Sequence, residues 1–549
     1  MNNKNWYRIF SGLIFGLLLI SESFEAHAQV QDVEIQIANP LKVTLPVAER
    51  NFEKIPIKPL EPVYPPLVYG YRPLTFSAPS FRPKIRPLKV REDNLKKSRE
   101  GYAAIGYGNY GGLLADLYFP VYNDEKSKSS SAVRANHNSF RTGPVGGERS
   151  GSGKSSVFMD WRTSSKGLLT EASVGFRNMN ANYYGYSETT NLKNDTLGIS
   201  YYDASVDLKF ANDRNANYQY VVSTGFSQLW NNRSANESAL KLGGDGRIKA
   251  GSKGEIKVQG EYDLFIRQDR AIPSGRRHLA QGETYFRYHG RDLQADVGIT
   301  GAAENDAAIN KFFHFYPLLR LNWRLMPDVM LEGNIGGKMD KVSLHSLTES
   351  NIWLDRDVAI SHSNERINGS AFFRAGVGKV LSFSAGARYA EISNLFFFVN
   401  QASDSSRFGV VYDDARKINP SLSVQFKRGS AAMELKADYY LWEIDQLAAA
   451  FHRPEGQVEW NGSFSFSPKF HFRPYALLLW GIKAPVVSEP SSVIELPAVT
   501  DIGFRFEFSF SEKGSAQLRV NNLLGTSYSL LQNYPVRGLQ GLVGLSWRF

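Results

Sequence analysis

The sequence contains no cysteine. Disulfides, a lipid-modified cysteine anchor, and thiolate metal or redox sites are therefore excluded. The absence does not argue against export, because a membrane-embedded β-barrel is held together by closed backbone hydrogen bonding and needs no cross-links.

Long apolar runs are also lacking. After residue 28 no stretch reaches the roughly 18 apolar residues that a membrane-spanning helix needs, and the mean hydropathy is −0.33. Aromatic residues nevertheless make up 13% of the chain, with 27 Tyr and 35 Phe. This combination is typical of a transmembrane β-barrel, in which one face of each strand meets lipid and aromatic girdles mark the two interfaces.

Charge of one sign is only slightly in excess. The 64 Lys and Arg against 54 Asp and Glu give a formal net charge of +10, and no long basic tract occurs. Nucleic acid is therefore not an expected partner. Outer-membrane lipid and lipopolysaccharide are the expected neighbours of these charges.

Residues 1–28 have the features of a secretory signal peptide. Lys4 and Arg8 form a positive start, residues 9–20 form a short apolar core, and Ala26 and Ala28 offer a small-residue cleavage site before Gln29. The sequence therefore predicts export with cleavage, and a mature chain that starts near Gln29.

Residues 29–100 are irregular and hold 11 of the 24 prolines. Proline removes backbone donors and fixes φ, so this stretch cannot be a central strand or a long helix. Its basic residues alternate with apolar ones, unlike a plain disordered linker. We expect a periplasmic or lumen-docked segment that is ordered by docking, with a periplasmic protein or a lipoprotein as a candidate partner.

From residue 101 to 549 the pattern has a period of two. In residues 255–267 Ile256, Val258, Tyr262, Leu264 and Ile266 share one face, opposite charged residues; residues 433–442 and 502–510 repeat the pattern. Strict alternation with charge on the second face indicates one wall in lipid and one in water. The predicted fold is all-β, a transmembrane antiparallel barrel.

Short turns alternate with long polar segments, as expected for periplasmic turns and extracellular loops. This rhythm predicts about 22 strands, within a range of 16–22, and an even number leaves both barrel ends on the periplasmic side. The predicted turns are residues 212–215, 250–254, 326–329, 427–429 and 511–514, and the predicted loops are residues 140–153, 187–195, 269–282, 343–363 and 486–497.

The last strand alternates up to the final residue. Leu545, Trp547 and Phe549 resemble the terminal signal by which the barrel assembly machinery recognises outer-membrane substrates. A terminus inside a strand makes sense only if that strand pairs with the first one and closes the sheet. The sequence therefore predicts a barrel in the outer membrane of a Gram-negative cell.

The preceding stretch resembles the C-terminal end of TonB-dependent receptor barrels over about the last 35 residues. In that family an Asn-Leu pair, a Tyr, a Tyr-Pro and a Gly precede the final aromatic strand. The matching positions are Asn522, Leu523, Tyr528, Tyr534, Pro535 and Gly538. The resemblance implies a receptor-like outer-membrane barrel.

The N-terminal region departs from that family. A TonB-dependent receptor carries a globular plug ahead of its barrel, and residues 29–100 lack plug-like strand and helix patterns. Asp32, Val33, Glu34 and Ile35 faintly resemble a TonB box. The resemblance therefore implies a plug-less relative, in which coupling to TonB stays an open question.

Catalytic and metal motifs are sparse. The nine histidines show no metal-ligand spacing, and we expect neither a cofactor nor an enzyme. His137 and Ser139 share one strand face, as in a barrel hydrolase with its site on the outer wall. The favoured interpretation is that they are polar residues facing the lumen.

A barrel of this size encloses a lumen that must be filled to keep solutes out. Three occupants are considered: the Pro-rich segment, whose cations would meet the inward acids Glu261, Asp263 and Glu434; a partner protein; or extracellular loops folded inward. The leading functional hypothesis is passage of a solute or docking of a partner. The alternatives are a scaffold subunit of an assembly or secretion complex, and a barrel hydrolase.

Overall fold

The computed structural model describes residues 100–124, 128–186, 197–212, 217–272, 274–306, 312–486 and 489–549. The signal peptide, the TonB-box-like residues 32–35 and the Pro-rich segment up to residue 99 lie outside these ranges. Their roles remain predictions. No helix in the described residues has both the length and the apolar character needed to cross a membrane.

The wall is built from consecutive strands that pair with their sequence neighbours. The wall strands are β1 (Tyr102–Gly108), β2 (Gly112–Asp124), β3 (Ser129–Phe140), β4 (Ser152–Ser165), β5 (Leu168–Asn182), β6 (Gly198–Asn212), β7 (Tyr218–Asn231), β8 (Asn236–Lys249), β9 (Gly254–Gln268), β10 (Gly275–His289), β11 (Leu293–Glu304), β12 (Phe313–Met326), β13 (Val329–Asp340), β14 (Ser363–Val377), β15 (Leu381–Asn400), β16 (Phe408–Arg428), β17 (Ala431–Tyr439), β18 (Leu441–Ile444), β19 (Gly456–Ser467), β20 (Phe470–Trp480), β23 (Val499–Ser509), β24 (Gly514–Asn521) and β27 (Gln540–Arg548).

Short elements connect these strands. They are the 3-10 helices η2 (Asn109–Gly111) and η3 (Gly147–Ser150), the helix α2 (Leu344–Ser350), and the strands β21 (Lys483–Val486), β22 (Glu489–Glu495), β25 (Ser529–Leu531) and β26 (Tyr534–Pro535).

The sheet closes on itself because β27 pairs antiparallel with both β24 and β1. β17 and β18 both pair with β16 and are two pieces of one strand, so the described residues form a closed antiparallel barrel of 22 strands. The predicted strand number and closure are confirmed. The strand itself ends at Arg548, but Phe549 continues the ladder through two backbone hydrogen bonds with Gly101.

The two faces of the wall have opposite chemistry. On β9 Ile256 and Val258 are exposed on the outside, whereas Glu255, Asp263 and Arg267 are buried on the inside. Large apolar side chains are exposed around the whole outer wall. An apolar outside and a charged inside fit a barrel embedded in a bilayer, as the alternation predicts.

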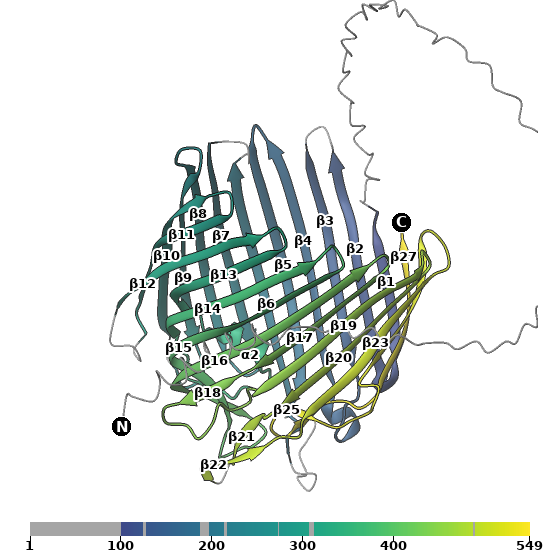
Figure 1. The fold of residues 1–549 in the computed structure, drawn as a ribbon. Coiled ribbons are helices and arrows are strands. Elements are labelled where there is room, and N and C mark those ends of the chain that lie inside the picture. Colours follow the sequence, from purple (N-terminus) through teal and green to yellow (C-terminus); the bar gives the residue numbers. More distant parts are fainter. Residues whose placement is uncertain are drawn as a thin grey trace, which may run out of the picture. The chain divides into compact units, whose positions relative to one another are not determined.

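The two ends of the barrel differ, as Figure 1 shows: α2, β21, β22 and β25 gather at one end, and the C-terminus lies at the other. We call these the loop end and the turn end. The predicted turns near residues 250–254, 326–329, 427–429 and 511–514 all lie at the turn end. Part of the predicted turn at 212–215, and the predicted loop at 187–195, lie outside the described residues.

One loop prediction is wrong in its extent. Residues 269–282 were expected to form a loop, but β10 begins at Gly275. The glycine and arginine content of this stretch resembles a loop. In the structure Gly282 instead pairs with Gly260 across the ladder, and Arg277 faces the lumen within the polar network described below.

Candidate functional site

The loop end of the barrel is covered by residues 341–362, which connect β13 to β14 and contain α2. We call this segment the cap. Ser343 begins α2 with a capping box, in which its side chain accepts the Ser346 N–H and the Ser346 hydroxyl accepts the Ser343 N–H. Glu237 of β8 accepts the N–H groups of Leu344 and His345 at 3.0 and 3.2 Å. A carboxylate there offsets the positive end of the helix and fixes it to the wall.

Apolar contacts hold the cap across the opening of the barrel at its loop end, which we call the mouth. Leu344, Leu347 and Leu354 are buried in one cluster with Tyr183 and Phe408. Tyr183 directly follows β5, and Phe408 begins β16, which lies eleven places further around a ring of 22 strands. The cluster therefore joins opposite sides of the barrel. Each fully buried leucine contributes roughly 2 kcal/mol.

Aromatic side chains from two other loops complete the cluster. Trp353 of the cap stacks on Tyr534 with ring centroids 3.9 Å apart, and Tyr184 meets Tyr534 edge-on at 4.8 Å. The Trp353 indole N–H donates to the Asn182 carbonyl at 3.0 Å, and the Tyr183 hydroxyl donates to the Leu354 carbonyl at 2.8 Å. Of the three occupants considered from the sequence, inward-folded loops are thus present at this end.

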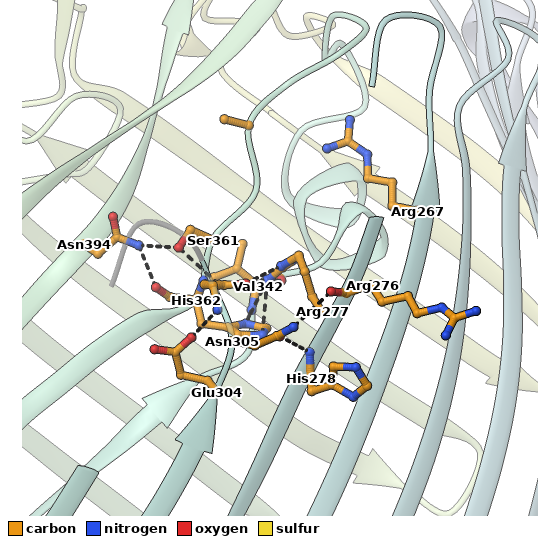
Figure 2. A network of polar contacts seen from close by, with 12 residues as sticks. Arg267, Arg276, Arg277, His278, Glu304, Asn305, Val342, Ser361, His362 and Asn394 are labelled. Carbon is orange, nitrogen blue, oxygen red and sulfur yellow. Dashed lines mark hydrogen bonds and ion pairs between the residues drawn. The ribbon is translucent and has the colours of Figure 1, made fainter. Parts of the chain in front are cut away.

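A polar network holds the two ends of the cap, at Val342 and at Ser361 and His362 (Figure 2). The Arg277 guanidinium donates to Asp306 at 2.7 Å and to the Val342 carbonyl at 2.9 Å. Asp306 also accepts the His362 N–H at 2.6 Å and the Ser361 hydroxyl at 3.1 Å. Asn394 of β15 donates to the His362 carbonyl at 2.7 Å and to Ser361 at 2.9 Å.

His362 is the most buried member of this network, with 0% exposure. Burial, and next the neighbouring Arg277 charge, lower the pKa of His362 to about 4. The ring is therefore neutral at neutral pH, and Nδ1 accepts the Val342 N–H at 3.1 Å. Burial by itself would raise the pKa of Asp306, but its bond to Arg277 lowers that pKa. The ion pair is thus charged and the histidine is not.

Two further anchors use wall charges. Arg267 of β9 binds Asp269 at 2.9 Å and also donates to the Val358 carbonyl of the cap. Lys341 pairs with Glu261 at 2.8 Å and with Asp263 at 3.0 Å. Both acids lie on the inward face of β9, and the cation that meets them comes from the edge of the cap.

Glu434, the third predicted lumen acid, lies away from the cap. It faces inward on β17, where it accepts from Gln425 at 2.9 Å and pairs with Lys436 at 3.2 Å. It lines a lumen cavity of about 570 Å³ together with Arg374 and Asp438. The structure does not bring Glu434 together with Glu261 and Asp263.

Cavities lie beside the cap and below it in the lumen. One of about 520 Å³ lies between the wall and the cap, lined by Asn138, Lys154, Tyr184, Asn351, Trp353 and Arg537 among others. A larger one of about 840 Å³ follows the inner face of the wall, where Asp245, Glu283, Arg320 and Glu332 give it a mixed polar surface. Such surfaces suit a hydrated, hydrogen-bonding solute more than an apolar one.

The family-like terminal residues belong to the loop between β24 and β27, which also reaches the mouth. Asn522 is buried and ties this loop together, donating to the Thr526 and Arg537 carbonyls at 2.8 and 3.0 Å. Tyr528 is buried and donates to Asp501 at 3.0 Å. Tyr534 and Pro535 form β26, Leu523 is exposed, and Gly538 lies near the Tyr110 hydroxyl.

The predicted barrel signal lies on the outer face at the closing strand. Leu545 and Trp547 of β27 point away from the lumen and are 56% and 48% exposed. Phe549 lies beside Phe119 of β2, with ring centroids 6.1 Å apart. These positions fit a terminal strand whose lipid-facing side is recognised by the barrel assembly machinery.

His137 and Ser139 were expected to face the lumen, and this prediction is wrong. They lie on the same face of β3 as Val133, which pairs with the exposed Phe119 and Met159 of the outer wall. The inward residues of β3 include Arg134 and Asn136, which bind Asp160 and Asp116. Parity along the strand places His137 and Ser139 toward lipid.

Sequence reasoning missed the cap residues Trp353, His362 and Arg277. One signal could have found part of the cap: inside a predicted loop, Ser343 and Ser346 each precede a leucine, so Leu344 and Leu347 are spaced by three. That spacing indicates a capped helix with one buried face. Nothing in the sequence pairs Arg277 with Asp306 or His362, because that contact depends on the closed barrel.

Comparison of the sequence with models of protein families finds no match, and comparison with curated protein sequences finds none either. Solved structures do match in fold. The siderophore receptor PirA from Acinetobacter baumannii aligns with a TM-score of 0.64 at 10% identity, covering 82% of this chain and 80% of that one.

Two further structures give the same result. The FrpB iron transporter from Neisseria meningitidis, F5-1 variant, aligns with a TM-score of 0.63 at 8% identity and covers 82% of each chain. The ferric-catecholate import receptor Fiu from Escherichia coli K12 aligns at 0.61 with 10% identity, over 82% of this chain and 81% of that one. This chain has the fold of a receptor-type outer-membrane barrel. The predicted resemblance is confirmed at the level of fold.

Proposed function

We propose that this chain is an outer-membrane barrel of the receptor type, in which a solute passes through the lumen when the cap opens. The observation that carries the proposal is the closed mouth: the cap joins opposite walls over a lumen with a polar inner surface. The fold neighbours are named as a siderophore receptor, an iron transporter and an import receptor, which supports a role in uptake.

The loop end would face the outside of the cell, because both barrel ends and the short turns are expected on the periplasmic side. The cap would then close the lumen against the medium. Outer-membrane lipid would surround the apolar wall, and the barrel assembly machinery would read the terminal strand. Coupling to TonB and a partner bound by residues 29–100 stay predictions.

The cap anchors are suited to a gate. Asp306 and His362 are buried, Arg277 is largely buried, and the three are bonded to one another, so the closed state is specific. Opening would expose these groups to water, which recovers part of the solvation energy that burial removes. Because this hydration offsets part of the cost of opening, a cap held by polar groups opens more readily than one held by apolar contacts alone.

Conductance in planar lipid bilayers tests the proposal. The full chain is compared with a variant in which residues 344–360 are replaced by a short Gly-Ser linker. We expect a low resting current from the full chain and a large, steady current from the variant, because the contacts across the mouth are gone.

The control is a Gly-Ser insertion after Gly251, at the turn end, where the structure leaves space around the glycine. It is expected to conduct like the unmodified chain. A chain that lacks residues 29–100 but keeps the cap is also expected to stay closed. A cap replacement that conducts no more than the full chain would remove the basis of the proposal.

A further inference from the structure

A small polar patch interrupts the apolar outer wall near the loop end of β3, β4 and β5. Two cross-strand rows form it: Ser139 pairs with Gly153, which pairs with Asn180, and His137 pairs with Ser155, which pairs with Asn178. The next row toward the turn end is apolar, with Ala135, Val157 and Phe176. The patch therefore lies at the border between the lipid-facing band and the loop end.

His137 lies between two serine hydroxyls. Its Nε2 is 2.8 Å from Ser139 Oγ, and its Nδ1 is 2.8 Å from Ser155 Oγ. If Nδ1 carries the ring proton and donates it to Ser155, the Nε2 lone pair accepts the Ser139 hydroxyl. The ring then acts as a base toward Ser139, and Ser155 fixes the tautomer and the ring orientation.

Gly153 has no side chain, and it lies between the side chains of Ser139 and Asn180. A Cβ placed on Gly153 would lie 3.3 Å from Ser139 Cβ and 3.2 Å from both amide atoms of Asn180. Asn180 uses one amide hydrogen on Asn178 at 3.2 Å, which leaves the second for another acceptor. A carbonyl group over Gly153 would thus have a hydroxyl on one side and an amide donor on the other. This is the arrangement that acyl transfer needs.

We propose that this patch hydrolyses an acyl ester of a membrane lipid, with Ser139 as nucleophile and His137 as general base. Ser139 Oγ forms a bond to the ester carbonyl carbon while its proton passes to His137 Nε2. The Asn180 amide stabilises the oxyanion. The bond to the alcohol oxygen then breaks, and His137 returns the proton to that oxygen.

Water completes the cycle. His137 takes a proton from a water molecule, the water oxygen attacks the acyl carbon, and the bond to Ser139 Oγ breaks with return of the proton. The products are a free fatty acid and the de-acylated alcohol. No oxidant, metal or second protein enters this balance.

The location points to a lipid as the substrate. The patch faces out of the barrel, next to the exposed side chains of Leu113, Val157 and Phe176. Tyr202 and Trp230 stack at 5.7 Å on the adjoining strands, and such aromatics are typical of the membrane–water interface. Ester bonds of membrane lipids lie at that depth, between the headgroups and the acyl chains.

Labelling with a fluorophosphonate tests the nucleophile in the full, detergent-extracted protein. We expect labelling of the unmodified chain, loss of labelling in S139A and H137Q, and unchanged labelling in S131A. Ser131 is the matched control, since it lies on the same strand and the same face, six residues from the histidine. Heat-modifiable migration in gels verifies that each variant is folded. A folded, unmodified chain that is not labelled overturns the proposal.

Vesicle assays separate the two lipid sources. Fluorogenic phospholipid vesicles and vesicles containing lipopolysaccharide are supplied in turn, and release of fatty acid is measured. Release from either one, lost in S139A, supports the ester chemistry and names the source. Release from neither, by a folded protein, overturns it.

Ser155 and Asn180 have separate tests. S155A should lower kcat roughly 10- to 100-fold with little change in KM, and S155T should restore it, because only the hydroxyl orients the ring. N180L should lower kcat roughly 10²- to 10³-fold, the range for loss of one oxyanion donor. If S155T is as slow as S155A, or N180L is fully active, these assignments are wrong.

Discussion

In the wall, β9 and β10 pair along the whole length of β10, so each residue gains ladder hydrogen bonds that do not depend on its side chain. The cap, in contrast, makes a single backbone bridge to the wall within the described residues, between Leu354 and Phe408. The cap is held instead by side chains: three buried leucines, a Trp–Tyr stack and a buried ion pair. The wall should therefore tolerate single side-chain changes that release the cap.

The largest single-residue effect is expected for D306N. The change leaves the largely buried Arg277 guanidinium without its carboxylate, and breaking a buried pair in this way costs about 3–5 kcal/mol. Hydrogen exchange of cap amides should accelerate by at least about 10²-fold, since 1.4 kcal/mol is tenfold, while exchange in β9 and β10 stays unchanged. Equal acceleration in cap and wall would mean that the two are one cooperative unit.

A pH effect on the cap comes next in size. His362 is neutral in the closed state with a pKa of about 4, against about 6.5 when exposed. Between these values the open state binds a proton that the closed state does not, so closure is fully stable above about 6.5 and weakens as pH falls toward 4. The loss amounts to at most about 3 kcal/mol.

Cap exchange measured at intervals from pH 7 to pH 4, corrected for intrinsic rates, gives this profile. H362N should flatten the part of the profile that belongs to His362, because the amide has no charge to gain. A wild-type profile that matches H362N across that window would rule out the histidine as its source.

E237Q is expected to have a smaller effect, about 1–2 kcal/mol. A glutamine offers one carbonyl oxygen to the two N–H groups of Leu344 and His345 and no charge to the helix start. Exchange at these amides should rise about tenfold. E349Q is the control, because Glu349 is 42% exposed at the other end of α2, and its loss should change little.

The smallest effect is expected for R141A. The Arg141–Glu148 pair lies at the same end of the barrel, but its side chains are 76% and 64% exposed. Exposed pairs contribute about 1 kcal/mol or less. Cap exchange and conductance should match the unmodified chain, and a clear change in either would show that the cap depends on more of the mouth than its buried anchors.

The same contrast explains what the sequence could predict. Alternation in residues 255–267 predicts which side chains meet lipid, because the pleat fixes parity once the strand exists. The terminal alternation through Leu545 and Trp547 likewise predicts closure by the last strand. These are local rules, and the structure follows them.

Cap contacts follow no local rule. Glu237 and Leu344 are 107 positions apart in sequence, and Tyr183 and Leu354 are 171 apart. Their proximity depends on the curvature of the closed barrel. The alternation of β3 would have predicted that His137 faces outward. The prediction instead followed its polar character and placed it in the lumen, which the position of His137 along the strand contradicts.

A reversible lock on the cap tests the central claim most directly. Leu354 and Phe408 are bridge partners between the cap and β16, a spacing that a disulfide can span. The chain has no cysteine of its own, so L354C/F408C introduces the only pair. In planar bilayers we expect brief openings from the reduced variant, none after oxidation, and their return on reduction. Openings that persist unchanged in the oxidised variant would contradict the cap as the gate.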